Sequence, residues 1–168
     1  YSFTYLSSGR DLLTFTSTPR NTSPAVLLGD PIYGIEKKTA SNSIPRSFDD
    51  PLESRYKRLR GTGEEVEVIG ELLGVKPLLR GAATEEAVKQ VQSPFILHIA
   101  THGLFERVLN PPELPTIDRE SLLRSGLVLS GFKQDKRVGD NGLLTALEAA
   151  GLNLLGTELV VLSACDTG

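Results

Sequence analysis

Two short apolar runs that end in small and reactive residues restrict the folds open to this chain. Residues 159–162 read LVVL and lead into SACDTG, and residues 95–100 read FILHIA and lead into THG. Short apolar runs that contain β-branched residues are typical of strands buried on both faces of a parallel sheet. Because such strands must be covered by helices on both sides, the chain is expected to be an α/β protein.

Two helices are predicted from their caps and from the spacing of apolar residues. Residues 62–74 have apolar side chains at helical spacing, Thr62 and Glu65 match a capping box, and Gly74 matches a residue that ends a helix. A second helix is predicted over residues 84–91, with a threonine cap and two glutamates in the first turn, where the helix dipole favours them.

The order of the segments predicts a mostly parallel sheet. An apolar run at residues 25–29 precedes the first helix, and residues 77–79 form a short strand between the two helices. The chain therefore reads strand, helix, strand, helix, strand up to residue 100. This order implies parallel strands that are joined by helices on the faces of the sheet.

A hairpin and a second capping box are predicted before the last strand. Residues 126–130 (GLVLS) form a short strand, and the Asp-Asn-Gly turn at residues 140–142 lets it pair with residues 143–144. Thr145 and Glu148 then match a capping box that opens a short helix.

Composition and charge exclude several classes of protein. The net charge of −3 argues against a dedicated nucleic-acid binder, and no apolar run approaches the roughly 20 residues needed to span a bilayer. No signal peptide is recognisable at the N-terminus. The single cysteine cannot form an internal disulfide, so the chain fits a reducing compartment and is expected to be cytoplasmic.

The chain is expected to be part of a longer protein. It contains no methionine, and it ends soon after the strand at residues 159–162, which as a buried strand needs neighbours on both sides. At least one more strand and helix are therefore expected after Gly168. Within the chain, residues 32–60 are rich in turn-forming residues and are predicted to be a flexible loop. The basic residues at its end are interpreted as a solvated surface, with a patch for an acidic partner as the alternative; they are Arg55, Lys57, Arg58 and Arg60.

A thiol and an imidazole follow two strands of the same kind. Cys165 and His102 come soon after the apolar runs, and in open α/β sheets ligands bind at the carboxyl ends of the strands. A cysteine thiolate is a good nucleophile, and a nearby imidazole can take the thiol proton. The N–H groups of Gly103 and Cys165 are candidate donors to a developing oxyanion. The pattern predicts a nucleophile–base pair.

The same residues also have structural interpretations. A lone cysteine at a strand end can be a small buried hydrophobe, and a histidine there can be structural or simply exposed. His98 lies inside the strand and is expected to be packed and hydrogen-bonded. A metal site made of His98, His102 and Cys165 has no recognised ligand spacing, so no metal is expected.

Four segments of the chain resemble a known family. They read GTGEEVEVIGELLG, ILHIATHG, LLRSGLVLS and NGLLTALEAAGLNLLGTELVVLSACDTG. They are similar to the CHAT domain, a caspase-related domain of the separase, gingipain and caspase group of cysteine peptidases, often found beside TPR repeats in bacterial proteins. The resemblance runs from about Tyr5 to Gly168, and HIATHG and LSACDTG, in this order and spacing, are its most specific motifs.

The resemblance implies a fold and a set of catalytic residues. The fold is a three-layer caspase-like sandwich, and residues 1–168 form an incomplete CHAT domain because family members continue past the cysteine. The implied function is that of a cysteine endopeptidase that hydrolyses protein or peptide substrates without a cofactor. His102 is the implied base, Cys165 the implied nucleophile, and Gly103 matches a glycine of the oxyanion hole.

The resemblance also bears on specificity and regulation. Asp30 ends the first core strand, at a position that often lines the substrate pocket in this group, where it would suit a basic side chain. Its alternative role is that of a turn-forming residue before Pro31. The fragment alone is expected to be inactive, and the resemblance implies activation by a partner domain or ligand. The alternatives to a peptidase are a non-catalytic CHAT scaffold for interaction or signalling and a different thiol hydrolase.

Overall fold

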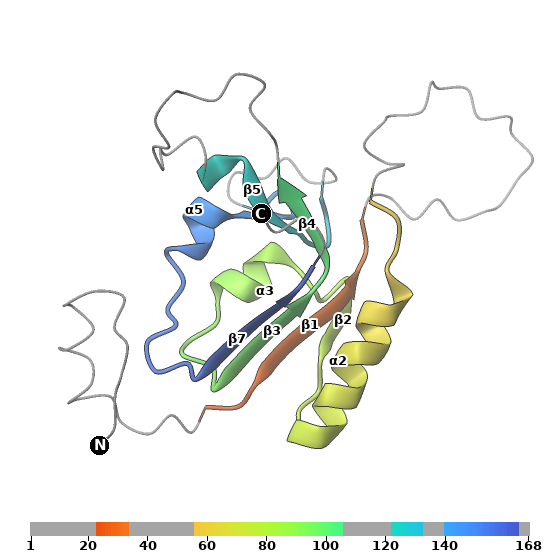
Figure 1. Ribbon diagram of the computed structural model, residues 1–168, viewed down its shortest axis with the longest axis vertical. Helices are drawn as coiled ribbons and strands as arrows, with labels where there is room; N and C mark the ends of the chain where they lie inside the picture. Colours follow the sequence, from red (N-terminus) through yellow and green to blue (C-terminus); the bar gives the residue numbers. More distant parts are fainter. Residues whose placement is uncertain (1–22, 34–55, 106–121, 133–139, 165–168) are drawn as a thin grey trace, which may run out of the picture.

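The computed structural model describes residues 23–33, 56–105, 122–132 and 140–164 (Figure 1). Strands and helices alternate along most of the chain. In order, the elements are β1 (Val26–Pro31), α2 (Arg60–Leu73), β2 (Leu78–Arg80), α3 (Glu85–Lys89), β3 (Ile96–Ala100), β4 (His102–Phe105), β5 (Ser125–Val128), β6 (Leu143–Thr145), α5 (Ala146–Ala149) and β7 (Leu159–Ser163).

A four-stranded parallel sheet lies at the centre of the structure. Its strand order is β2-β1-β3-β7, and each neighbouring pair is parallel. The two strands singled out in the sequence, β3 and β7, are therefore neighbours. They pair in register from Ile96 opposite Leu159 to Ala100 opposite Ser163.

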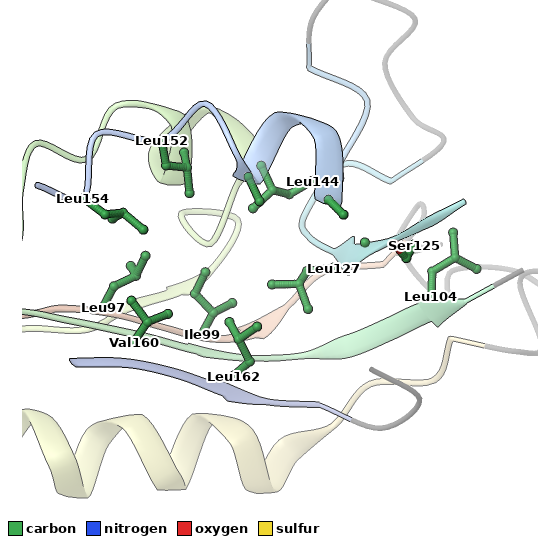
Figure 2. Close-up of a pocket in the computed structure, with 13 residues that line it drawn as sticks. Leu97, Ile99, Leu104, Ser125, Leu127, Leu144, Leu152, Leu154, Val160 and Leu162 are labelled. Carbon is green, nitrogen blue, oxygen red and sulfur yellow. The ribbon is translucent and has the colours of Figure 1, made fainter. Parts of the chain in front are cut away.

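Helices cover both faces of this sheet. Successive strand residues point to opposite faces, so Leu27 packs with Val66 of α2 while Leu28 joins the core that contains Val88 of α3. Figure 2 shows the sheet between α2 (yellow) on one side and α5 (blue) on the other. The predicted α/β fold with a mostly parallel sheet is confirmed, and the three layers are consistent with a caspase-like sandwich.

A second, antiparallel sheet has the order β4-β5-β6. The predicted hairpin is confirmed, because Leu127 of β5 pairs with Leu144 of β6. The sequence pattern placed His102 at the end of the apolar strand, whereas His102 is the first residue of a separate strand, β4, and pairs with Val128. The chain thus passes from one sheet to the other with only Thr101 between β3 and β4.

The start of α2 differs from the prediction, and the capping box there is wrong. Leu59 is the N-cap and makes no side-chain cap hydrogen bond. The Thr62 hydroxyl donates to the Leu59 carbonyl at 2.7 Å and accepts the Asp30 N–H at 2.9 Å. It therefore joins the first turn of α2 to the end of β1. The other end is as predicted, because Gly74 ends the helix with a φ of 67°.

Gly29 allows α2 to lie unusually close to β1. A Cβ at this position would be 2.5 Å from the Thr62 carbonyl oxygen and 2.7 Å from Cγ2 of Val66. Only glycine therefore fits without a shift of the helix. The close approach brings the first turn of α2 against the end of β1, where the candidate site begins.

The two remaining caps are local and match the prediction. Thr84 accepts the Ala87 N–H at 3.1 Å and caps α3. Thr145 and Glu148 form the complete capping box of α5. Because each cap depends only on residues within one helical turn, the sequence pattern is sufficient to predict it.

The strand β7 is more exposed than predicted. Leu159, Val160 and Leu162 are 50%, 44% and 49% exposed. Within the described residues, β7 is the outer strand of the sheet and pairs only with β3. The prediction that this strand is buried on both faces is therefore wrong for the described part of the chain, because one of its edges has no described neighbour.

Candidate active site

The carboxyl ends of β3 and β7 are held together up to the residue before His102. The pairing of the two strands ends at Ala100 and Ser163, and the Thr101 N–H then donates to the Ser163 carbonyl at 3.0 Å. The backbone that leads into His102 is thus bonded to the backbone two residues before Cys165. Cys165 itself lies outside the described residues, so its role as nucleophile stays a prediction.

The imidazole of His102 has a defined hydrogen-bond partner. Its Nε2 lies 2.7 Å from the backbone carbonyl oxygen of Lys57. A carbonyl oxygen can only accept, so Nε2 donates and carries a proton in this contact. In the neutral imidazole, Nδ1 is then the unprotonated nitrogen. The contact therefore leaves Nδ1 as the atom of His102 that can accept a proton from a nucleophile.

Two tyrosines contact the His102 ring. The ring centroids of Tyr33 and Tyr56 lie 5.0 Å and 5.4 Å from that of the imidazole. The Tyr33 hydroxyl lies 2.8 Å from Oγ1 of Thr101, whose own proton goes to the Val128 carbonyl, so the tyrosine donates. Burial raises the pKa of Tyr33 above the ordinary value for a phenol. Both rings restrict the positions that the imidazole can adopt.

His98 is packed and hydrogen-bonded, as predicted. It is 5% exposed, and its Nε2 lies 2.8 Å from Oε1 of Glu65 on α2. The second oxygen of Glu65 accepts the Ser163 hydroxyl at 3.1 Å. One carboxylate on α2 thereby connects β3, two residues before its end, with the last residue of β7.

Asp30 lies at the end of β1 and is already paired within the chain. Its carboxylate accepts two hydrogen bonds from Arg58, at 2.7 Å from Nε and 2.5 Å from the terminal nitrogen, and Arg80 lies 3.7 Å away. The hydrogen bonds from Arg58 lower the pKa of Asp30, and they outweigh burial, which acts in the opposite direction. Asp30 has a φ of 47°, in the left-handed region that aspartate tolerates better than most residues. Its predicted contact with a basic substrate side chain stays a prediction.

Gly103 follows His102 within β4. It pairs with Leu127 of β5. Its predicted contribution to an oxyanion hole, together with the N–H of Cys165, stays a prediction.

Sequence reasoning missed the residues that surround His102. Lys57 acts through its carbonyl, which every residue has, and it is 45 positions away from the histidine. Arg58 was interpreted as part of a solvated surface, and its side chain is indeed 44% exposed although its guanidinium binds buried Asp30. These residues lie at the end of the predicted loop at 32–60. That prediction stays open for residues 34–55, which are not described.

An apolar cavity of about 220 Å³ lies on the face of the sheet opposite α2, between the strands and α5 (Figure 2). Figure 2 shows Leu97 and Ile99 of β3 and Val160 and Leu162 of β7 on its floor, with Leu152 on the opposite side. Its lining is almost entirely aliphatic, so it offers shape and apolar surface rather than groups for chemistry.

Among the described residues, no three histidine, cysteine, aspartate or glutamate side chains gather so that they could hold a metal ion. No helix in the described ranges has the length and apolar character needed to cross a membrane.

Comparison with known proteins identifies the family. A model of the CHAT domain matches residues 1–168, the whole of the sequence. Neither a curated protein nor a solved structure matches the chain. The chain belongs to the CHAT domain family, which is related to the caspase-like peptidases.

Proposed function

We propose that this CHAT domain is a cysteine endopeptidase in which Cys165 and His102 form the catalytic dyad. The register of β3 and β7 supports the proposal most directly. Ala100 pairs with Ser163, so His102 and Cys165 each follow the last paired residue of their strand by two positions. Because neighbouring strands lie about 4.8 Å apart, side chains at these positions can meet after a short bend of the backbone.

The proposed reaction proceeds through an acyl-enzyme. Nδ1 of His102 takes the proton of the Cys165 thiol, and the sulfur attacks the carbonyl carbon of the scissile peptide bond. The N–H groups of Gly103 and Cys165 stabilise the oxyanion that forms. The C–N bond then breaks, and the imidazolium gives its proton to the leaving amine. Water, deprotonated by His102, hydrolyses the thioester and restores the thiol.

The contacts of His102 support its role as the base. The Lys57 carbonyl holds Nε2 in its protonated form, and the positive imidazolium that forms during the reaction retains this hydrogen bond. The carbonyl thus has the role of the third member of a catalytic triad, which orients the base and stabilises its charged form.

The proposed substrate is a protein or a peptide. Following the family resemblance, we place activation with a partner domain or ligand, for which TPR repeats in the parent protein are one candidate. The competing function is that of a non-catalytic scaffold, and the experiment below separates the two.

The proposal is tested by covalent labelling. The protein is incubated with a peptide that carries a cysteine-directed electrophile, and mass spectrometry locates the label. We expect labelling at Cys165, and we expect the rate to fall by about 10²-fold or more in His102→Ala, the usual scale for loss of a general base. Glu86→Ala, an exposed change on α3, is the matched control and should label like the unchanged protein.

Two results would contradict the proposal. One is the absence of labelling at Cys165 under every activating condition, including addition of partner domains, which would favour the scaffold. The other is an equal labelling rate with and without the imidazole, which would remove His102 from the reaction.

A further inference from the structure

Three successive residues before α2 each contact the surroundings of His102 in a different way. Tyr56 is 8% exposed and lies with its ring against the imidazole. The Lys57 carbonyl accepts a hydrogen bond from Nε2 of His102, and Arg58 binds the carboxylate of Asp30. We refer to Tyr56, Lys57 and Arg58 as the 56–58 segment.

The geometry points to a positioning role for the Asp30–Arg58 ion pair: it holds the Lys57 carbonyl on Nε2 of His102 and thereby fixes which ring nitrogen acts as the base. The importance of this role for catalysis rests on the proposed peptidase function. The hydrogen bond itself does not, and it can be measured independently.

Asp30 is a firm anchor for this segment. Its side chain is 7% exposed, and its backbone N–H donates to the hydroxyl of Thr62 at 2.9 Å. Arg58 binds it through two nitrogens, and a forked guanidinium–carboxylate pair fixes direction as well as distance. The position of the Arg58 side chain is therefore set by the end of β1.

The Lys57 carbonyl lies between two fixed neighbours. Consecutive Cα atoms are 3.8 Å apart, so a buried ring on Tyr56 and a paired guanidinium on Arg58 leave the intervening peptide little freedom. The side chain of Lys57 is exposed, so its carbonyl rather than its ammonium group serves the site. Loss of the ion pair removes a link between the segment and the end of β1 and leaves the ring contacts of Tyr56 with His102 and Phe132.

This assignment gives Asp30 a role different from that of a pocket for basic substrates. An incoming cationic side chain would meet a carboxylate that Arg58 already neutralises, with Arg80 3.7 Å away. The two roles lead to different results when Asp30 is changed, because the pocket role affects substrate preference and the positioning role affects the histidine.

The first test reads the hydrogen bond by NMR. The chain has only two histidines. The Nε2 proton of His102 reports the contact with Lys57 when it exchanges slowly with water. The corresponding proton of His98, which is bound to Glu65, reports that the fold is intact. We expect the His102 signal to persist in Lys57→Ala, which keeps the carbonyl, and to disappear in Arg58→Gln and in Asp30→Asn while the His98 signal remains.

The second test uses the peptidase reaction. We expect kcat to fall by about 10–100-fold in Arg58→Gln and in Asp30→Asn, the scale of loss that follows from misplacement of a reacting group. KM should change by less than about twofold, because the interaction serves the transition state rather than substrate binding. The double variant should be no worse than either single variant, because the two residues act as one unit.

The outcomes separate this inference from the proposed function. An unchanged His102 signal in both single variants would overturn the inference, as would a change in substrate charge preference in Asp30→Asn without any effect on the histidine. If the signal is lost in these variants but no peptide is cleaved even by the unchanged protein, the positioning contact stands and the peptidase proposal fails.

Discussion

Glu85 is a buried carboxylate that joins α3 to the turn before β6, and its replacement should destabilise the fold strongly. Its side chain is 1% exposed. One of its oxygens accepts the backbone N–H groups of Asn141 and Gly142 at 2.8 Å and 2.9 Å, and the other accepts from Lys89. The turn and the helix are thus held by one side chain, 56 positions away from Asn141.

The expected loss follows from the groups that would be left unpaired. A buried N–H without a partner costs about 1–3 kcal/mol. Gly142 is buried, whereas Asn141 is exposed and its N–H can turn to water. With the broken ion pair included, we expect Glu85→Ala to lower the free energy of unfolding by about 3–4 kcal/mol. Glu85→Gln keeps one acceptor and should cost about 1–2 kcal/mol.

Urea unfolding followed by circular dichroism measures the difference. With a slope of about 2 kcal/mol per molar urea, Glu85→Ala should shift the midpoint down by about 1.5 M or more. The control is Glu86→Ala, which lies on the same turn but is exposed and accepts a side-chain hydrogen bond from Gln90. It should cost less than about 0.5 kcal/mol. Equal midpoints for the two alanine variants would refute the reasoning.

Three further changes should have distinct effects on stability. Glu65→Ala removes the hydrogen-bond acceptor of buried His98 and of the Ser163 hydroxyl on β7, so urea unfolding should show that the free energy of unfolding falls by about 2–3 kcal/mol. A fall below about 0.5 kcal/mol would show that the Glu65 link between β3 and β7 is unimportant for stability. Gly142→Ala places a Cβ 2.1 Å from the Phe132 nitrogen at a φ of 74°, so thermal unfolding should show a loss above about 2 kcal/mol, and an unchanged midpoint would contradict this geometry. Asp30→Asn should flatten the acid side of the stability profile. Because Arg58 lowers the folded-state pKa of Asp30, the stabilisation by this ion pair is present above the unfolded-state pKa of about 4 and is lost as the pH falls through the folded-state pKa. Parallel plots of unfolding free energy against pH for the unchanged protein and Asp30→Asn below pH 4 would argue against this.

The sequence was most informative where the determining contacts are local or depend on a simple pattern. Apolar runs identified β1, β3 and β7, and the strand–helix order was sufficient to predict a parallel sheet. The caps at Thr84 and Thr145 were predictable because each cap bond stays within one helical turn. For the same reason the glycine that ends α2 could be identified.

The prediction was wrong where a distant partner competes for a local group. Thr62 has the right residue type for a capping box, but its hydroxyl binds the end of β1, 32 positions away. Glu85 lies in the first turn of α3 as predicted, but its contact with a turn much later in the chain has no local signature. Burial of β7 depends on its neighbours in space, which the run of valines and leucines does not specify.

The candidate site was predictable only in part. His102 could be identified as a candidate from its motif and its place at the end of a strand. Its partner on Lys57 could not, because a backbone carbonyl has no signature in the sequence. The ion pair between Asp30 and Arg58 was equally hidden, since charged residues near a helix start usually indicate a solvated surface.

The thiol of Cys165 and the imidazole of His102 are proposed to lie close enough to exchange a proton. The pH dependence of alkylation tests this directly, because the chain contains one cysteine and iodoacetamide therefore reports on a single thiol. We predict an apparent thiol pKa below the usual value of about 8.5 in the unchanged protein and a return toward that value in His102→Ala. Identical alkylation profiles for the two proteins would contradict the account.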